Sequence, residues 1–263
     1  MIGAVWDTDV RPWEGPILTS VVNEFENLSG DGYGAKLEAT TMLPGLFLPA
    51  FPWRDGCHAK TFAANMRRMT GYISLARDRY GGSVGLTPED PSRAQITYDT
   101  HASDKAHILH GLLRLAELLY VAGAREIHST LPTLPPFIRP SPSSQPSKTS
   151  LHPISSPSLN DTAFQSWLSA LEATGGPVRF ASAHQMGSCR MGTAEGNSAV
   201  DEKGRVWGCE GLWVCDASVF PSASGVNPMI TNMGIARGIA RGVVEEWRAS
   251  SSSGGRKEEK AKL

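Results

Sequence analysis

Short stretches in which apolar and polar residues alternate predict β-strands in several parts of the chain. Residues 35–41, "AKLEATT", have the two-residue period of a half-buried strand. The stretches "GGSVGLT" and "AQITYD" have strand character as well, and a proline-containing loop at 88–92 joins them. Two further runs, "PVRFAS" and "LWVCDA", lie nearer the end of the chain. The predicted strands are therefore 35–41, 81–87, 94–99, 177–182 and 212–217.

Longer segments in which apolar residues recur every three or four positions predict helices. The clearest begins with Ser103 as its N-cap, runs to about Ala122 and ends at Gly123. The full set of predicted helices is 58–79, 103–122, 161–174 and 228–247. Because helices and strands alternate with one long interruption, we expect a mixed α/β or α+β fold.

The interruption is the segment 131–158, which is rich in proline and serine. Such a composition buries too little apolar surface to fold alone, so we interpret the segment as a surface loop or linker. The polar residues 249–263 at the end of the chain are predicted to be disordered.

Composition narrows the classes of function. The 263 residues carry a net charge of −1, so no basic field attracts nucleic acid, and a small substrate of little charge is expected. The N-terminus lacks the apolar core of a secretory signal, and no apolar run approaches the ~20 residues of a membrane span. Cysteines without a CxxC pair are expected to be reduced and mostly buried; they are Cys57, Cys189, Cys209 and Cys215.

The segment "GDGYGA", Gly30 to Ala35, fits the glycine pattern of dinucleotide-binding proteins by its letters alone. That site requires a buried strand before the glycines and a helix after them, because the pyrophosphate binds at the helix N-terminus. A polar segment precedes these glycines and a strand-like segment follows them. We therefore interpret the glycines as a turn.

The segment "SAHQMGSCRMG", 182–192, holds a histidine and a cysteine five residues apart. A zinc site requires three or four ligands at recognisable spacings, and no second close pair is present, so no metal site is predicted. A thiol catalyst requires an exposed thiolate beside its base, and nothing in the segment specifies one. From these residues alone, a histidine hydrogen-bonded in the core remains the simplest alternative.

The residues downstream change that interpretation. The apolar run at 212–217 ends in an acid, and a loop then leads to Asn227 and Pro228, which together favour the start of a helix. A helix N-terminus is a favourable place for negative charge. Within this helix Gly234, Gly238 and Gly242 recur every fourth residue, which predicts close packing on that side.

Three segments together resemble the C-terminal signature of the glucose–methanol–choline (GMC) flavin oxidoreductases. They are "AHQMGSCRMG", "VDEKGRVWGCEGLWVCDASVFPS" and "GVNPMITNMGIARGIA", in the order and at the separation usual in the family. Other segments, such as "GDGYGAKLEATTMLPGLF", "LARDRYGGSV" and "YVAGAREIHST", look most like the long-chain alcohol oxidases of plants and fungi. The resemblance covers roughly residues 15–248 apart from the Pro/Ser-rich segment.

The resemblance implies FAD-dependent oxidation of an alcohol, with hydride passing to the flavin and O2 reduced to hydrogen peroxide. His184 matches the catalytic histidine of the family, and an imidazole that titrates near neutrality suits a proton acceptor. Asn227 matches the second active-site position, where an amide donates to the developing alkoxide. Asp216 and Ala217 match a segment that contacts the ribityl and phosphate region of FAD. The positions against the isoalloxazine ring are matched by Asn227, Pro228 and Met229.

The resemblance also implies a domain arrangement. Residues 1–180 match the substrate-binding domain with its antiparallel sheet and helices, and 181–248 match the C-terminal strand and helix of the FAD-binding domain. The N-terminal Rossmann half of the family is missing from the sequence, so we expect the chain alone to bind FAD weakly or not at all. The favoured substrate is a long-chain primary alcohol, and the alternative substrates are a sterol or a sugar. The alternative to an active enzyme is a catalytically inactive, truncated remnant.

The chain ends in Ala261-Lys262-Leu263, a near variant of the Ser-Lys-Leu tripeptide read by the peroxisomal import receptor. We therefore expect the peroxisome as the location, with membrane association or the cytoplasm as alternatives. The partners expected are an aliphatic alcohol, O2, that receptor and the missing FAD-binding half.

Overall fold

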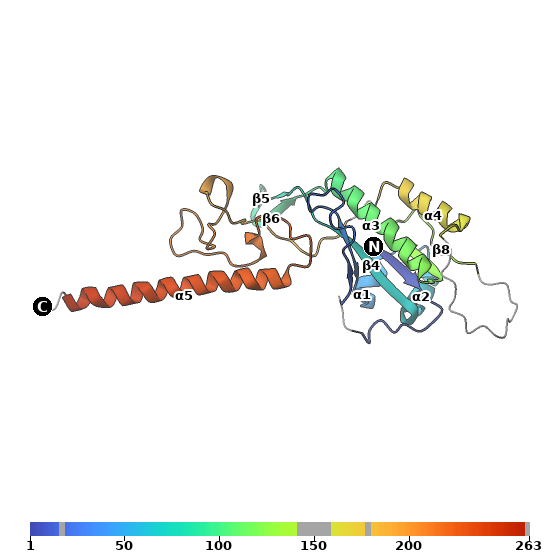
Figure 1. Cartoon of the computed structure of the whole chain (residues 1–263), viewed down its shortest axis with the longest axis horizontal. Coiled ribbons are helices and arrows are strands. Elements are labelled where there is room, and N and C mark those ends of the chain that lie inside the picture. The colour runs from blue at the N-terminus through green and yellow to red at the C-terminus, as the bar shows by residue number, and fades with distance from the viewer. Residues whose placement is uncertain (16–18, 141–158, 177–179, 261–263) are drawn as a thin grey trace. The chain divides into compact units, whose positions relative to one another are not determined.

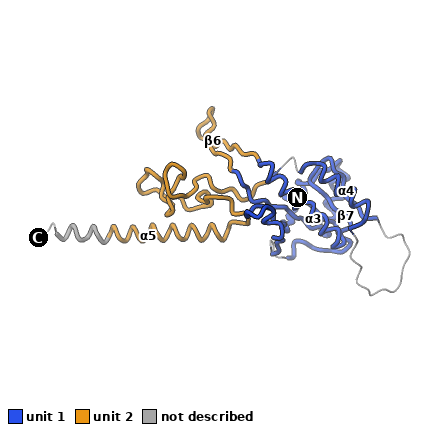
Figure 2. The backbone as a smooth tube through the Cα atoms, turned by 45° about the horizontal axis from the view of Figure 1, so that its top comes forward, with its two compact units in different colours: residues 1–80, 100–180 blue, residues 81–99, 181–263 orange. Residues whose placement is uncertain are grey.

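The computed structural model describes residues 1–15, 19–140, 159–176 and 180–260, and for 252–260 it describes the backbone alone (Figure 1). The chain forms two compact units (Figure 2). Unit 1 comprises Met1–Tyr80 and Thr100–Phe180, and unit 2 comprises Gly81–Asp99 and Ala181–Leu263. Residues 81–99 thus belong to unit 2, whereas the expected division places them in 1–180; that 1–180 and 181–248 are a substrate-binding and an FAD-domain portion stays a prediction.

Unit 1 is built on a six-stranded antiparallel sheet in the order β2-β3-β4-β1-β7-β8. The first strand of the chain lies in the interior of this sheet, where Gly3 pairs with Gly71 of β4 and with His128 of β7. The strands are β1 (Ile2–Val5), β2 (Val21–Val22), β3 (Ala35–Ala39), β4 (Met69–Ala76), β7 (Glu126–Ser129) and β8 (Phe137–Ile138). The antiparallel sheet predicted for this part of the chain is therefore confirmed.

Helix α3 (Ala102–Val121) packs on one face of the sheet, and α4 (Thr162–Ala173) packs against α3 (Figure 1). Eighteen buried apolar residues form the core on this side, Leu115 and Phe164 among them. The helix approaches the sheet closely at Gly111, where an added Cβ would lie 2.2 Å from Ser74 Oγ of β4. The helices predicted at 103–122 and 161–174 are confirmed, although the N-cap of α3 is the His101 ring and not Ser103.

The opposite face of the sheet is covered by α1 (Pro44–Phe47), the 3₁₀ turns η1 (Leu48–Ala50) and η2 (Met66–Arg68), and α2 (Gly56–Ala64). A second apolar cluster packs here, with Val5 contributed by β1 and Phe47 by α1. The two clusters use alternate positions of the same strands, since Ile2 and Ala4 face α3 while Val5 faces α1.

Two predictions in unit 1 need correction. The long helix predicted over 58–79 ends at Ala64. The second half of that range forms the strand β4, because it contains β-favouring Thr, Tyr and Ile residues and pairs with β1 on one edge and β3 on the other. The predicted loop 131–158 is in part folded, because Leu131, Leu134 and Phe137 are buried and β8 pairs with β7. Residues 141–158 lie outside the described residues.

Unit 2 contains the hairpin β5 (Ser83–Thr87) and β6 (Asp90–Thr97), the 3₁₀ turns η3 (Glu195–Asn197) and η4 (Ala217–Val219), and the long helix α5 (Met229–Lys260). The hairpin predicted at 81–99 and the turn predicted at the "GDGYGA" glycines are confirmed. Val200, Val219 and Ile239 form the buried apolar cluster of unit 2. None of the helices in the described ranges is long and apolar enough to cross a bilayer.

Unit 2 also departs from the predictions. Where a strand was expected at 212–217, the structure has a single bridge between Trp213 and Arg205. No neighbouring segment of the described chain pairs with 212–217 over a greater length. Residues 180–182 are not in a strand, and 177–179 lie outside the described residues. The tail expected to be disordered continues α5 to Lys260, as helix extension adds one backbone hydrogen bond per residue. The close packing expected at Gly234, Gly238 and Gly242 is not made by any described residue, since a Cβ on each would meet nothing within 4 Å.

Candidate functional site

Backbone hydrogen bonds hold the histidine-containing segment alongside η4. The amide N–H of Gly187 donates to the carbonyl of Ala217 (3.2 Å), and that of Met191 donates to Val219 (2.8 Å). Between them, Cys189 N–H donates to Ser218 O (2.9 Å). Two segments that are about 30 positions apart in sequence therefore run side by side within unit 2. Cys189 takes part through its backbone, and its side chain is half-buried. The expectation that the cysteines are mostly buried is wrong, because Cys57, Cys209 and Cys215 are exposed.

The same segment is also joined to the loop that leads into α5. Ser224 N–H donates to the sulfur of Met186 (3.4 Å), and Ser224 Oγ donates to Val226 O (2.5 Å). Met186 is two residues from His184, and Val226 precedes Asn227. These hydrogen bonds connect the segments that contain His184, Asp216 and Asn227.

Gly187 allows this arrangement. Its φ of +82° lies in the left-handed region that other residues rarely adopt, and an added Cβ would lie 3.3 Å from the carbonyl oxygen of Phe220. The glycine lets the chain turn between His184 and the residues that bind to η4.

His184 and Asn227 are both half-buried, so both are partly open to solvent, and His184 is not a core histidine. Each belongs to a segment without regular secondary structure that is fixed by the contacts above, and Asn227 lies two residues before α5. That the imidazole faces the amide across an alcohol stays a prediction.

Asp216 is an exposed carboxylate that caps η4. Its Oδ1 accepts hydrogen bonds from the Ser218 amide (2.8 Å) and from Ser218 Oγ (2.5 Å). The hydroxyl bond and then the amide bond lower the pKa of Asp216, so it is ionised at neutral pH. Its neighbour Ala217 uses its carbonyl to hold Gly187. The contact of these two residues with a cofactor stays a prediction.

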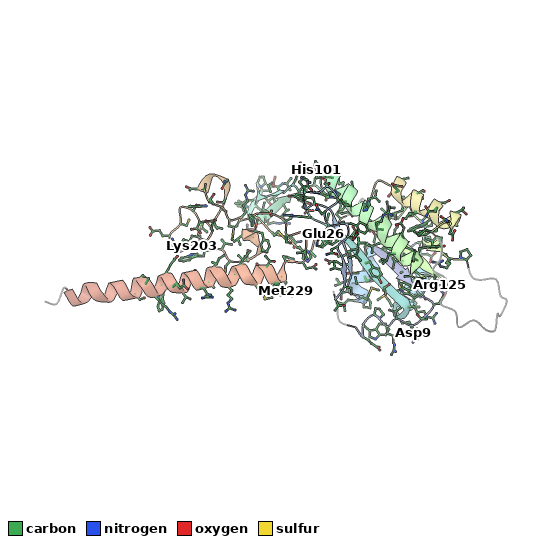
Figure 3. All side chains as sticks on the ribbon, viewed as in Figure 1. Asp9, Glu26, His101, Arg125, Lys203 and Met229 are labelled. Carbon is green, nitrogen blue, oxygen red and sulfur yellow. The ribbon has the colours of Figure 1, made fainter. Side chains whose placement is uncertain are left out.

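The start of α5 presents Pro228 and Met229 to the surroundings. The Pro228 carbonyl accepts the Asn232 amide (2.7 Å), which places Pro228 at the first turn, and the Met229 side chain is 66% exposed (Figure 3). A helix N-terminus carries partial positive charge and unpaired N–H groups, which suits an anionic ring. An exposed thioether beside it offers apolar contact to the face of such a ring.

Asn232 was not identified from the sequence. Its side-chain Oδ1 is buried in the first turn of α5 and accepts no hydrogen bond from any residue in the described ranges. A buried acceptor without a donor is unfavourable by about 1–3 kcal/mol. A group with N–H or O–H donors bound here would satisfy it, and FAD carries both. No local sequence signal marks this position, because the same letters occur on ordinary helix surfaces.

In the described residues no three His, Cys, Asp or Glu side chains gather closely enough to hold a metal ion. The described part of the site is therefore a half-buried imidazole, an amide, an ionised carboxylate and a helix N-terminus. This set can accept a proton, orient a hydroxyl group and hold an anionic planar cofactor.

Comparison with known proteins gives the class to which this set belongs. The family model described as GMC oxidoreductase matches residues 77–236, more than half of the chain. The Arabidopsis thaliana long-chain-alcohol oxidase FAO3 is 31% identical over 248 residues, covering 91% of this chain. The chain belongs to the GMC oxidoreductase family, whose members depend on FAD.

Two further comparisons show weaker similarity. An uncharacterized GMC-type oxidoreductase of Mycobacterium tuberculosis, Rv0492c, is 27% identical over 240 residues and 91% of this chain. A solved formate oxidase of Aspergillus oryzae covers 85% of the chain and 33% of its own, with 16% identity and a TM-score of 0.49. The chain spans about 30% of the length of FAO3 and 33% of that of Rv0492c.

Proposed function

We propose that this chain carries the proton-handling residues of an oxidase that converts a long-chain primary alcohol to the aldehyde and reduces O2 to hydrogen peroxide. Family membership supports the redox class, and relatives named as long-chain-alcohol oxidases, matched over 88–91% of the chain, support the substrate. Because the chain spans about 30% of FAO3, the activity is proposed for the assembly in which all flavin contacts are present.

The reaction assigns different tasks to the two residues. His184 accepts the hydroxyl proton of the alcohol while hydride leaves the carbon. Asn227 donates a hydrogen bond from its amide to the oxygen as negative charge develops there, and cannot compete as a base. Bound FAD supplies the two-electron acceptor that takes the hydride and passes both electrons to O2. The alcohol thus loses two electrons and two protons, and O2 gains them.

The observation that carries this proposal is the hydrogen-bonded link between the His184 segment, η4 and the loop before α5. It connects the segments of the proposed base, the proposed oxyanion donor and the proposed cofactor residues Asp216, Ala217, Pro228 and Met229. Asn232 Oδ1 offers one further acceptor at the same helix end.

The test measures hydrogen peroxide production by a complex of this chain with the part of FAO3 that has no counterpart in this chain. We expect peroxide with hexadecanol and little with cholesterol, glucose or choline. His184→Asn should abolish the activity, while His101→Asn, which exchanges one N-cap side chain for another on α3, should leave it unchanged. Activity with another alcohol alone would reject the substrate, and full activity of His184→Asn would reject the site.

We also propose import into peroxisomes through Ala261-Lys262-Leu263, which lies outside the described residues. A fluorescent fusion with a free C-terminus should enter peroxisomes, and deletion of Leu263 should leave it in the cytosol. Identical distributions of the two fusions would reject this address.

A further inference from the structure

Two hydrogen-bonded links connect the segments of the candidate site, and they use different chemical groups. Toward η4, the amides of Gly187, Cys189 and Met191 donate to backbone carbonyls. Toward the loop before α5, the acceptor is the thioether sulfur of Met186, which receives the amide hydrogen of Ser224 at 3.4 Å. A thioether is oxidised to the sulfoxide by mild oxidants that leave a backbone carbonyl unchanged. The second link, unlike the first, can therefore be altered by oxidation.

The sulfur contact lies close along the chain to both proposed catalytic residues. Met186 follows His184 in the same short segment, and Ser224 precedes Asn227 in the other. Ser224 Oγ also donates to the carbonyl of Val226 (2.5 Å), which ties the loop from Ser224 to Asn227 into a tight turn. A displacement of Ser224 is therefore transmitted to Asn227.

The methionines of the described chain differ in how far an oxidant can reach them. Three of them belong to the buried cluster under α1 and α2 and are at most 8% exposed: Met42, Met66 and Met69. Met186 is half-buried, so it is held in the site and is still open to a small molecule. Met229 and Met233 are 66% and 54% exposed, but they lie in α5, and their oxidation leaves the sulfur of Met186 as it is.

Oxidation changes the shape of this contact as well as its chemistry. Thioether sulfur is a weak hydrogen-bond acceptor, whereas a sulfoxide is polar and chiral and its oxygen accepts strongly. The Ser224 amide is then expected to turn from the sulfur of Met186 to the new oxygen, and the loop shifts by roughly the length of the S–O bond. A misplacement of ~1 Å can slow catalysis by ~10²-fold. Oxidation of Met186 should therefore lower activity without unfolding the chain.

We propose that Met186 is a peroxide-sensitive modification site, where hydrogen peroxide formed by the enzyme oxidises the thioether and slows further turnover. A lone pair of the sulfur attacks one peroxide oxygen, and the S–O bond forms as the O–O bond breaks. The hydroxide that leaves takes the proton from the oxygen retained by sulfur and becomes water. The sulfur loses two electrons and the peroxide gains them. The source of the peroxide rests on the proposed function, whereas the reactivity of Met186 does not.

The first experiment uses no substrate. The full chain is treated with hydrogen peroxide, the excess is removed with catalase, and sulfoxide at each methionine is measured by peptide mass spectrometry. We expect oxidation at Met186 and at the exposed Met233, and none at Met69, whose exposure is 0%. By NMR, the Ser224 amide of Met186→Leu should exchange its hydrogen several-fold faster than in the wild type, and that of Met233→Leu should be unchanged. An unmodified Met186 after complete oxidation of Met233 would overturn the proposal.

The second experiment measures flavin reduction by hexadecanol, without oxygen, in a complex of this chain with the part of FAO3 that has no counterpart in it. Peroxide treatment should slow the wild type by about 10–100-fold, and methionine sulfoxide reductases A and B should restore its rate. Met186→Leu should keep most of its own untreated rate, whereas Met233→Leu should lose the same fraction as the wild type.

Equal fractional losses in Met186→Leu and in the wild type would overturn the proposal, because the damage would then lie elsewhere. Absence of flavin reduction in the untreated complex would instead reject the proposed function, and with it the source of the peroxide. The first experiment decides the reactivity of Met186 in either case, so the two failures are distinguishable.

Discussion

The contact of α3 with the sheet at Gly111 allows a quantitative test of the fold that carries the site. In Gly111→Ala the new Cβ would lie 2.2 Å from Ser74 Oγ and 2.9 Å from Leu37 Cδ2, both well inside the ~3.5–4.0 Å of a favourable contact. Overpacking of this kind lowers stability by about 1–3 kcal/mol, while alanine in a helix returns about 1 kcal/mol. We expect a net loss of about 0–2 kcal/mol.

A second substitution should relieve most of that loss. Ser74 Oγ is buried and accepts no hydrogen bond from the described residues, so Ser74→Ala alone should be neutral or slightly stabilising. It also removes the closest atom to the new methyl group. Gly111→Ala should therefore be nearly neutral in the Ser74→Ala background, and the coupling energy between the two sites should be about 1–2 kcal/mol.

The assay is urea unfolding of the four proteins of this double-mutant cycle, followed by circular dichroism and tryptophan fluorescence. Gly45→Ala is the control, because it adds the same methyl group in α1 where nothing lies within 4 Å. Additive effects of Gly111→Ala and Ser74→Ala, or equal effects of Gly111→Ala and Gly45→Ala, would refute the close contact of α3 with β4.

Three further outcomes follow from single contacts. Leu115→Ala, at 1% exposure, should destabilise the chain by about 2–5 kcal/mol, whereas Leu118→Ala on the same helix, at 47%, should change the unfolding midpoint little. A hydrogen bond with His128 lowers the pKa of Glu126 below its ordinary value of 4.5. The stability that this hydrogen bond adds is therefore present above pH 4.5 and is lost as the pH falls through the lowered pKa of Glu126. Glu126→Gln should therefore unfold earlier than the wild type in urea at neutral pH, with the difference shrinking below pH 4.5. Asn232→Leu should leave the melting temperature of the chain alone unchanged or raised, yet weaken flavin binding by the assembled enzyme in a fluorescence titration.

Much of the fold was predictable because local patterns and tertiary contacts agree. The helix at 103–122 has a three-to-four period and a terminal glycine, and the structure contains it with small shifts at its ends, although its N-cap is His101 and not Ser103. The hairpin at 81–99 was predictable for a similar reason, since two alternating stretches flank a proline-containing turn.

The errors arose where local patterns are ambiguous. Residues Met69–Ala76 have apolar spacing that fits a helix, yet the segment is a strand because β1 and β3 pair with both of its edges. Conversely, the run at 212–217 is β-prone but has only Arg205 as a bridge partner at Trp213 in the described chain. Whether such a segment forms a helix, a strand or neither depends on pairing with segments far away in the sequence, and the periodicity of apolar residues carries no information about that pairing.

The candidate site, like the fold, was predictable from the sequence only in part. The resemblance of the three motifs to the family implies one site for His184, Asp216 and Asn227, and the backbone contacts of Gly187 and Cys189 join the first two of their segments. Sequence patterns did not identify Asn232 or the Met186–Ser224 contact, because a buried unpaired amide and a sulfur acceptor have no periodic signature.

The most direct measurement is the rate at which bound flavin is reduced by hexadecanol, without oxygen, in the chain assembled with the unmatched part of FAO3. If His184 accepts the hydroxyl proton, His184→Asn should slow this reduction by about 10²–10⁴-fold. The matched variant His101→Asn should reduce the flavin at the wild-type rate. Reduction by His184→Asn as fast as by the wild type would contradict the assignment.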